Sequence, residues 1–191
     1  QKSSRSIETI IIAKQAEKEA IYDDINLKIE RALDEATIYM NGKPVENTKA
    51  DFETRIGQAM DDLIKRVYGK LEHITAAKGP NDLAKALRKE KPVLELDVEN
   101  TENELALDDL KTYIQLVGQV SLRNVKDKFA LAPYGFIDDD INWLVGKLFM
   151  DGKLTVSING EIMSSVAIND KLMFDYITKK QYQDKLLLMV R

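Results

Sequence analysis

The segment from Ala132 to Ser165 constrains the fold more than any other part of the chain. A Pro133-Tyr134-Gly135 corner leads into an amphipathic helix that starts with Asp138 to Asp140 and stops at Asp151-Gly152. Carboxylates at a helix start cap free amides and favour the helix dipole, and a glycine commonly ends a helix. Two short alternating apolar runs follow, joined by the turn Asn159-Gly160. A helix followed by such a hairpin predicts the second half of a winged helix.

Two further helices precede this segment, as a winged helix requires. Apolar residues at helical spacing predict one helix that ends at Gly118 and a second that is capped by Ser121 and ends before Pro133. After the hairpin, the pattern predicts an amphipathic segment from Lys171 to Gln181 and then the apolar run Leu186 to Val190. Residues 105–191 are therefore predicted to form a winged-helix-like domain with a C-terminal extension.

The first half of the chain is predicted to be a long helical hairpin. Helical periodicity extends over residues 4–35 and again over residues 50–74. Between them, residues 37–45 contain an Asn41-Gly42 turn between short extended runs, which predicts a small β insertion. We expect the two helices to pack antiparallel in a domain of residues 1–92, with the acidic stretch 93–104 as a linker. The predicted fold class is mainly α, of the α+β type.

Composition and charge restrict the functions that the chain can have. The chain has 191 residues, a net charge of -4 and no cysteine, so disulfides and cysteine-ligated metals are excluded. No apolar run approaches the roughly 18 residues of a membrane span. These features favour a cytoplasmic protein without a membrane partner. The chain begins at Gln1 without a methionine and ends just after an apolar run, which predicts a piece of a longer protein.

The residues that carry chemistry do not form a recognisable catalytic pattern. The single histidine, His73, has no second imidazole or thiol with which to form a metal site. Adjacent carboxylates such as Asp108-Asp109 point about 100° apart on a helix and do not converge on one ligand. None of the Gly-Lys pairs follows the phosphate-binding spacing. We therefore predict no catalytic residue, no cofactor and no metal in this chain.

The predicted third helix leaves two roles open for the winged helix. Its aspartates lie where a DNA-reading helix meets phosphates, and would repel them. Residues 105–191 carry eleven Lys or Arg and eleven Asp or Glu, which cancel, so the chain totals of 28 and 32 leave -4 to residues 1–104. A protein-docking role is therefore favoured, and DNA binding is the alternative. The candidate nucleic-acid contacts are Arg123, Lys126, Lys128, Lys147 and Lys153, and the candidate partner surface comprises Tyr134, Phe136 and Trp143.

Three parts of the sequence carry a resemblance to a known family. They are the run Pro133-Tyr134-Gly135-Phe136, the Asp-rich helix start that follows it, and the hairpin from Lys153 to Glu161. Together they resemble a segment of the very large P-loop ATPases of BREX phage-defence systems, of the BrxC/PglY type. The likeness extends more weakly to Tyr39-Met40-Asn41-Gly42 and to the helix from Leu63 to Leu71.

The resemblance implies a region outside the ATPase core. No ATPase motif of that family matches here, so hydrolysis would belong to another part of the parent protein, and this chain would not be an enzyme by itself. The resemblance and the acid-capped third helix together lead to one hypothesis: the chain is a non-catalytic scaffold or partner-docking region of a phage-defence ATPase. Its partners would then be other protein components or domains of the parent assembly.

Overall fold

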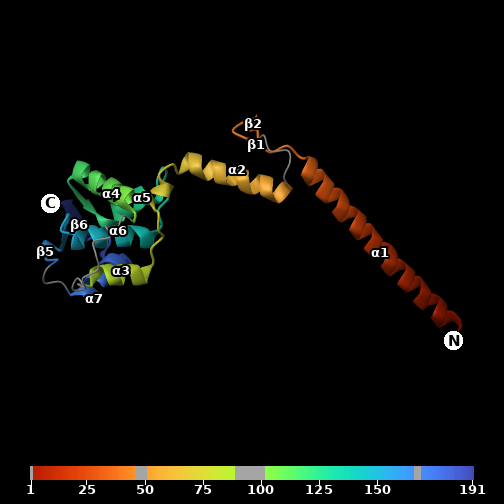
Figure 1. Ribbon diagram of the computed structural model, residues 1–191. Coiled ribbons are helices and arrows are strands. Elements are labelled where there is room, and N and C mark those ends of the chain that lie inside the picture. Colours follow the sequence, from red (N-terminus) through yellow and green to blue (C-terminus); the bar gives the residue numbers. More distant parts are fainter. Residues whose placement is uncertain (1, 46–50, 89–101, 166–168) are drawn as a thin grey trace, which may run out of the picture. The chain divides into compact units, whose positions relative to one another are not determined.

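The computed structural model describes residues 2–45, 51–88, 102–165 and 169–191 (Figure 1). The chain divides into two compact units, Gln1–Ile64 and Lys65–Arg191. Helices dominate both units, and the strands form one two-stranded and one four-stranded sheet among the described residues. The predicted class, mainly α with a small β content, is therefore confirmed.

The first unit contains two long helices joined through a small β hairpin. Helix α1 spans Lys2–Glu35, strand β1 spans Tyr39–Met40, strand β2 spans Lys43–Pro44, and helix α2 spans Phe52–Val67, which carries it past the end of the unit. The strands pair antiparallel, Tyr39 with Pro44 and Met40 with Lys43. Asn41 and Gly42 have φ angles of 51° and 74°, as the predicted Asn-Gly turn requires.

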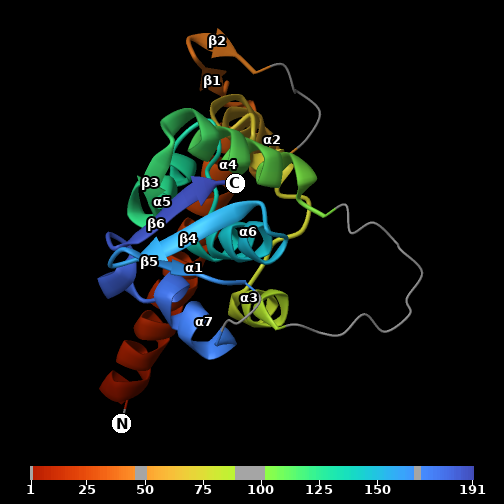
Figure 2. The ribbon, with the colours of Figure 1, turned by 90° about the vertical axis from the view of Figure 1, so that its left-hand side faces the viewer.

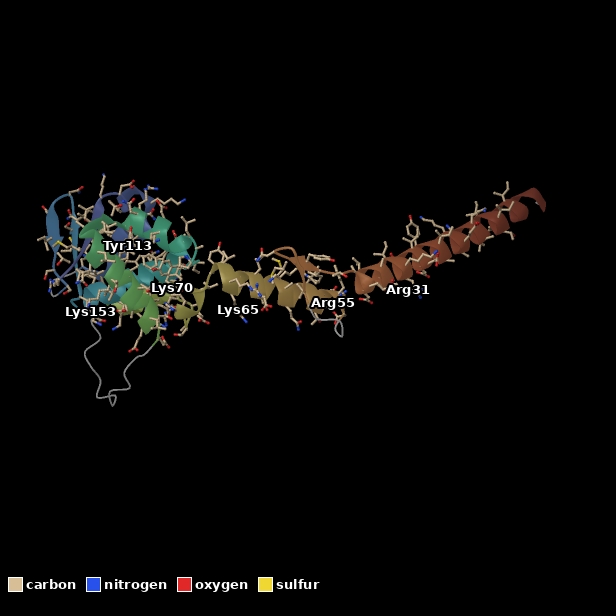
Figure 3. All side chains as sticks on the ribbon, turned by 90° about the horizontal axis from the view of Figure 1, so that it is seen from above. Arg31, Arg55, Lys65, Lys70, Tyr113 and Lys153 are labelled. Atoms are coloured by element: carbon tan, nitrogen blue, oxygen red, sulfur yellow. The ribbon has the colours of Figure 1, made fainter. Side chains whose placement is uncertain are left out.

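The apolar positions of the first unit are largely exposed. Every side chain from Ile7 to Glu35 on α1 is exposed, and on α2 Ile56 and Met60 are 41% and 53% exposed. Buried contact occurs instead at the C-terminal end of α1. There the guanidinium of Arg55 donates to the carbonyl oxygens of Leu33, Asp34 and Ala36 at 2.8 to 2.9 Å. Figure 3 shows Arg55 beside the end of the helix that bears Arg31. The predicted packing of the two helices along their lengths is thus not observed among the described residues.

The second unit has the helices and strands of a winged helix, with additions before and after them. Helices α4, α5 and α6 and the hairpin of β4 and β5 follow in the predicted order, with α3 before them and α7 after them. Strand β3, between α4 and α5, was not predicted. The bounds are η1 Leu71–His73, α3 Pro80–Leu87, α4 Glu104–Val117, β3 Gln119–Ser121, α5 Leu122–Ala130, α6 Asp138–Met150, β4 Leu154–Ile158, β5 Glu161–Met163, α7 Asp170–Thr178, η2 Lys180–Tyr182 and β6 Leu186–Val190.

The sheet of the second unit corrects the prediction for the end of the chain. Its strand order is β3-β6-β4-β5 and every pairing is antiparallel. The run from Leu186 to Val190, predicted to belong to a C-terminal extension, is therefore a central strand. Leu186 and Leu188 are fully buried, because alternate side chains of this strand face the helices. The predicted hairpin is present as β4 and β5, which leaves β5 at the edge of the sheet.

The boundary between the two units differs from the predicted one. The division falls after Ile64 rather than after residue 92, because α3 belongs to the core of the second unit. Leu83 and Leu87 of α3 are each 1% exposed and pack with the winged-helix core. Residues 93–101 of the predicted linker lie outside the described residues. Asn103, which follows them, is fully buried and exchanges two hydrogen bonds of 2.9 Å with the backbone of Ala76.

None of the helices in the described ranges combines the length and apolar content that a membrane span requires. The long helix α1 is too polar to span a membrane, because charged side chains recur along it, such as Lys14, Glu17 and Lys18.

Candidate functional site

Helix α6 occupies the position of the DNA-reading helix in a winged helix, and it is buried. It lies between α4 on one side and α3 with α7 on the other, as Figure 2 shows. From Asp140 to Gly146 every side chain of the helix is buried, and Leu148 and Phe149 are 1% exposed. A recognition helix needs one exposed face to enter the major groove. In this chain that face is covered by the chain itself.

A glycine on α6 allows α3 to approach closely. A Cβ atom at Gly146 would lie 2.6 Å from Cδ1 of Leu83 and 3.6 Å from Cδ2 of Leu87. Ile177 of α7 would lie 3.9 Å from the same point, so both added helices converge on this position. Helix α3 starts at Pro80, where the backbone N–H of Gly79 donates to the Asp82 carboxylate at 2.9 Å. The covering helix is therefore capped and tightly seated on α6.

The aspartates at the start of α6 have partners within the chain. Asp140 is 5% exposed and accepts a hydrogen bond of 2.7 Å from the backbone N–H of Lys78. Burial raises the pKa of Asp140, and the Lys78 hydrogen bond opposes that rise. Asp138 pairs with the ammonium of Lys126 at 3.1 Å. These carboxylates thus hold α6 to the segment before α3 and to α5, in addition to favouring the helix dipole.

Three of the five predicted nucleic-acid contacts are held in internal ion pairs. Lys126 is 5% exposed beside Asp138, which removes it from the accessible surface. Arg123 pairs with Asp184, with Nη2 at 2.9 Å from the carboxylate, and this pair raises the pKa of Arg123 and lowers that of Asp184. Lys147 pairs at 2.8 Å with Asp151, the residue that follows the last residue of α6. For Lys126 the predicted role is corrected: its side chain packs between two helices and its charge is used there.

The other two predicted cations are exposed and lie in different surroundings. Lys128 is on α5, and its ammonium lies 6.0 Å from the centre of the Tyr134 ring. Lys153 follows α6 and lines a hollow of about 220 Å³ together with Glu104, Asp108 and Lys111 of α4. Within the described part of the chain, neither side chain has an ion pair. The structure does not gather the five predicted cations into one basic patch.

The three aromatic residues predicted as a partner surface are mostly packed inside. Phe136 is 2% exposed and Trp143 is 5% exposed, so these two side chains belong to the core and do not form a docking surface. Tyr134 is half-buried, with its ring centre 4.3 Å from that of Phe129 and 5.5 Å from that of Phe136. The ammonium of Lys78 covers Trp143, 4.8 Å from the centre of the indole. Their apolar area serves packing in this unit.

The arrangement of the second unit agrees with the comparison with known families. Residues 65–191 match the family described as the winged helix-turn-helix domain of the BREX ATP-binding protein BrxC. Residues 1–63 match the fourth domain of BrxC, described as having a six-stranded β-sheet. The chain belongs to the BREX BrxC family. It is therefore part of a BREX phage-defence protein, as the resemblance implied. No solved structure matches the chain.

The division of the BrxC matches coincides with the division of the structure. One match ends at residue 63 and the next begins at residue 65, while the structural units meet between Ile64 and Lys65. In the BrxC winged-helix domain, α3 is therefore an integral part, although the sequence pattern placed its residues in the first domain. The sequence pattern alone did not show this, because α3 has only eight residues and is followed by the acidic stretch.

One cluster of polar side chains in this BrxC chain was not predicted from the sequence. Asp109 of α4 accepts from the Lys70 ammonium at 2.5 Å and lies 2.6 Å from Nδ1 of His73. The Asp109 hydrogen bond raises the pKa of Lys70, whose backbone N–H also donates to the carbonyl of Pro133 at 2.9 Å. The cluster ties η1 to α4 and to the turn before α6. No group of three or more His, Cys, Asp or Glu residues in the described ranges could hold a metal ion.

Proposed function

We propose that residues 65–191 serve as a non-catalytic protein-docking module of BrxC, in which α6 is a structural helix and not a DNA-reading one. The observation that supports this most directly is the burial of α6 from both sides, by α4 on one and by α3 and α7 on the other. A docking module needs a rigid core and an exposed recognition surface, and the burial of α6 provides the core. In this proposal the hydrolysis of ATP belongs to another part of the BrxC assembly.

The free energy needed to move α3 away from α6 indicates that α3 covers α6 permanently. To expose the helix, Leu83 and Leu87 of α3 would have to leave the core, and each buried leucine contributes roughly 2 to 3 kcal/mol by burial alone. Gly146 fits α3 closely, so the contact excludes water. Once exposed, the start of α6 would present three aspartates to the phosphates. The cost of exposing the two leucines and the repulsion between the aspartates and the phosphates both oppose DNA binding through this helix.

The turn between α5 and α6 offers the surface that we propose for docking. Leu131 is 65% exposed and Ile137 is 58% exposed, one on each side of the predicted Tyr134 motif. The turn between them is held in place from within, because Tyr134 packs on Phe129 and Phe136. Exposed apolar side chains on a rigid support are typical of the centre of a protein interface. We call Leu131 and Ile137 the turn surface.

A substitution pair with a matched control tests this proposal. Ile137→Glu in a BrxC protein should reduce the recovery of other BREX components in a pull-down at least about tenfold, because it places a charge at the centre of the interface. Ile162→Glu is the control: Ile162 is 70% exposed on the edge strand β5 and lies outside the turn surface. Equal recovery with both variants and the wild type would exclude docking through the turn surface.

Duplex-DNA binding by the purified chain, at low and at near-physiological salt, tests the alternative. We expect no binding at either salt concentration. Micromolar or tighter binding that weakens steeply with salt would overturn the docking proposal in favour of phosphate contacts. In that case Lys128→Glu and Lys153→Glu should each weaken binding, because both cations are exposed and have no ion pair in the described ranges. Lys126→Glu would not separate the two proposals, because Lys126 is buried.

A further inference from the structure

Helix α1 presents one apolar stripe to solvent along nearly its whole length. Large apolar residues recur on one face at steps of three or four, interrupted in the middle by Lys14 and Lys18. We call these apolar residues the α1 stripe. Their exposed fractions range from 44% to 61%. The α1 stripe consists of Ile7, Ile10, Ile11, Ile21, Ile25 and Ile29.

A shallow, open hollow of about 470 Å³ lies beside the stripe on α1 and is lined by Lys14, Glu17, Lys18, Ile21, Tyr22 and Ile25. A single helix in water with this much exposed apolar area gains little from its own propensity, and helices in proteins owe most of their stability to the packing of such a face. We therefore expect the α1 stripe to pack against another surface.

The charges within the stripe argue against a second copy of the same helix as its cover. Lys14 and Lys18 lie on the same face as Ile11 and Ile21. Lys14 pairs with Glu17 at 2.6 Å, and Lys18 lies 5.5 Å from the centre of the Tyr22 ring. In a parallel pair of α1 helices each lysine would face its own copy across the seam, and in an antiparallel pair centred on this region Lys18 would face Lys18. Both arrangements place like charges where a coiled coil needs apolar contact.

The family match of the first unit describes a β-sheet that α1 could cover. The matched fourth domain of BrxC is described with a six-stranded β-sheet, whereas the described residues of 1–63 contribute the two short strands β1 and β2. A sheet with an apolar face needs a helix against it, and an amphipathic helix needs such a face. Helix α2 also has an apolar face without a cover among the described residues, because Ile56, Met60 and Ile64 are 40% to 53% exposed.

We infer that the α1 stripe packs against the β-sheet of the fourth BrxC domain, so that this helix is a layer of that domain. The stripe extends from Ile7 to Ile29 on a helix of 34 residues, so a surface that covers it must be long, as the face of a sheet of several strands is. The ammonium groups of Lys14 and Lys18 reach past the apolar contact to its rim, while their stems remain in it. The inference concerns residues 1–63 alone and is independent of the docking role proposed for the second unit.

Site-specific photo-crosslinking tests the inference in a BrxC protein that carries this chain together with the complete fourth domain. Benzoylphenylalanine replaces Ile25 in one variant and Leu27 in a matched control. Leu27 is 56% exposed and, two residues away, points to the opposite side of α1. We expect position 25 to crosslink to strands of the sheet in the same polypeptide. Position 27 should give about tenfold less of that product, because it faces away from the sheet.

Two outcomes would overturn the inference. One is a crosslink from position 25 to α1 of a second copy or to a separate protein, and the other is an equal yield from positions 25 and 27. A second measurement covers variants that fold poorly: hydrogen exchange of the α1 amides in Ile25→Glu and Leu27→Glu. We expect Ile25→Glu to remove protection from α1 and Leu27→Glu to leave it unchanged. The turn-surface variants should not alter either result, so the two proposals fail separately.

Discussion

The two units of this chain place similar leucine and isoleucine side chains in opposite environments. In the second unit, Leu83 and Leu87 of the short helix α3 are 1% exposed, because α6 and α7 surround them. In the first unit, Leu27 and Ile25 of the 34-residue helix α1 are 56% and 44% exposed. Helix length and hydrophobic content therefore do not decide which element is buried. What decides it is whether the partner surface lies within the same unit.

The two helices have different structural roles. Helix α3 completes a closed core and, in doing so, covers the face of α6 that would otherwise be free for DNA. Helix α1 keeps its apolar face available for another surface. A substitution of the same kind should therefore have a large effect on the second unit and little effect on the first, when the chain is studied by itself.

The largest effect should come from removing the α3 anchor. Leu83→Ala should lower the free energy of unfolding of the second unit by about 2 to 5 kcal/mol, because it leaves a cavity against α6. Leu27→Ala, on the exposed side of α1, should change the free energy of unfolding of the first unit by less than about 0.5 kcal/mol. Urea unfolding followed by the fluorescence of Trp143, the single tryptophan, measures the second unit, and the circular dichroism of the helices measures the first. Similar losses in the two variants would contradict the division between a closed and an open unit.

Glycine substitutions should differ in sign between the units. Gly146→Ala places a Cβ atom 2.6 Å from the buried end of Leu83 and should cost about 1 to 3 kcal/mol through overpacking. Gly57→Ala on α2 meets no atom within 4 Å and should gain up to about 1 kcal/mol of helix stability. Thermal unfolding followed by circular dichroism compares the two. A gain from Gly146→Ala would show that α3 sits more loosely than its contacts indicate.

Predictions from local patterns were reliable for the winged helix. The three helices, the Asn159-Gly160 turn and the start of α6 at Asp138 were all expected from residues a few positions apart. The start of the second unit was not, because Leu83 and Leu87 become core only through contact with α6, more than 50 residues later. The central strand β6 was missed for the same reason: its pairing with β3 joins residues far apart in sequence.

For the candidate site residues, the sequence pattern did not predict which side chains are buried. Lys126 is one of three cations close together on α5, and the pattern does not show that its face of the helix meets Asp138. Trp143 was predicted as part of a partner surface, and its burial depends on Lys78 and α3, which lie in the part assigned to another domain. Charge and periodicity identify candidate surfaces, but the covering element decides which of them are accessible.

The Arg55 contact should be the clearest energetic link within the first unit. Arg55→Ala removes the guanidinium that donates to three carbonyls at the end of α1 and should cost about 1 to 3 kcal/mol, mostly as local fraying. Hydrogen exchange of the amides near Leu33 measures the effect. Arg31→Ala is the control, because Arg31 lies on α1 close to Leu33 and its side chain is exposed. Unchanged exchange in Arg55→Ala would mean that α1 ends at Glu35 without this support.

The smallest effect should appear in the pH dependence of the second unit. Asp140→Asn keeps an oxygen acceptor for the Lys78 N–H and removes a buried carboxylate whose pKa is raised by burial and by the neighbouring Asp139. A raised folded-state pKa means that Asp140 contributes stability fully below its ordinary pKa of 3.8, and that this contribution is lost as the pH rises through the raised value. The variant lacks that titration. Its free energy of unfolding, relative to the wild type, should therefore increase as the pH rises above 3.8. Urea unfolding across that pH range measures the difference. A decrease would mean that the Lys78 ammonium and the hydrogen bond outweigh burial, so that the cover of α6 relies on an ionised Asp140.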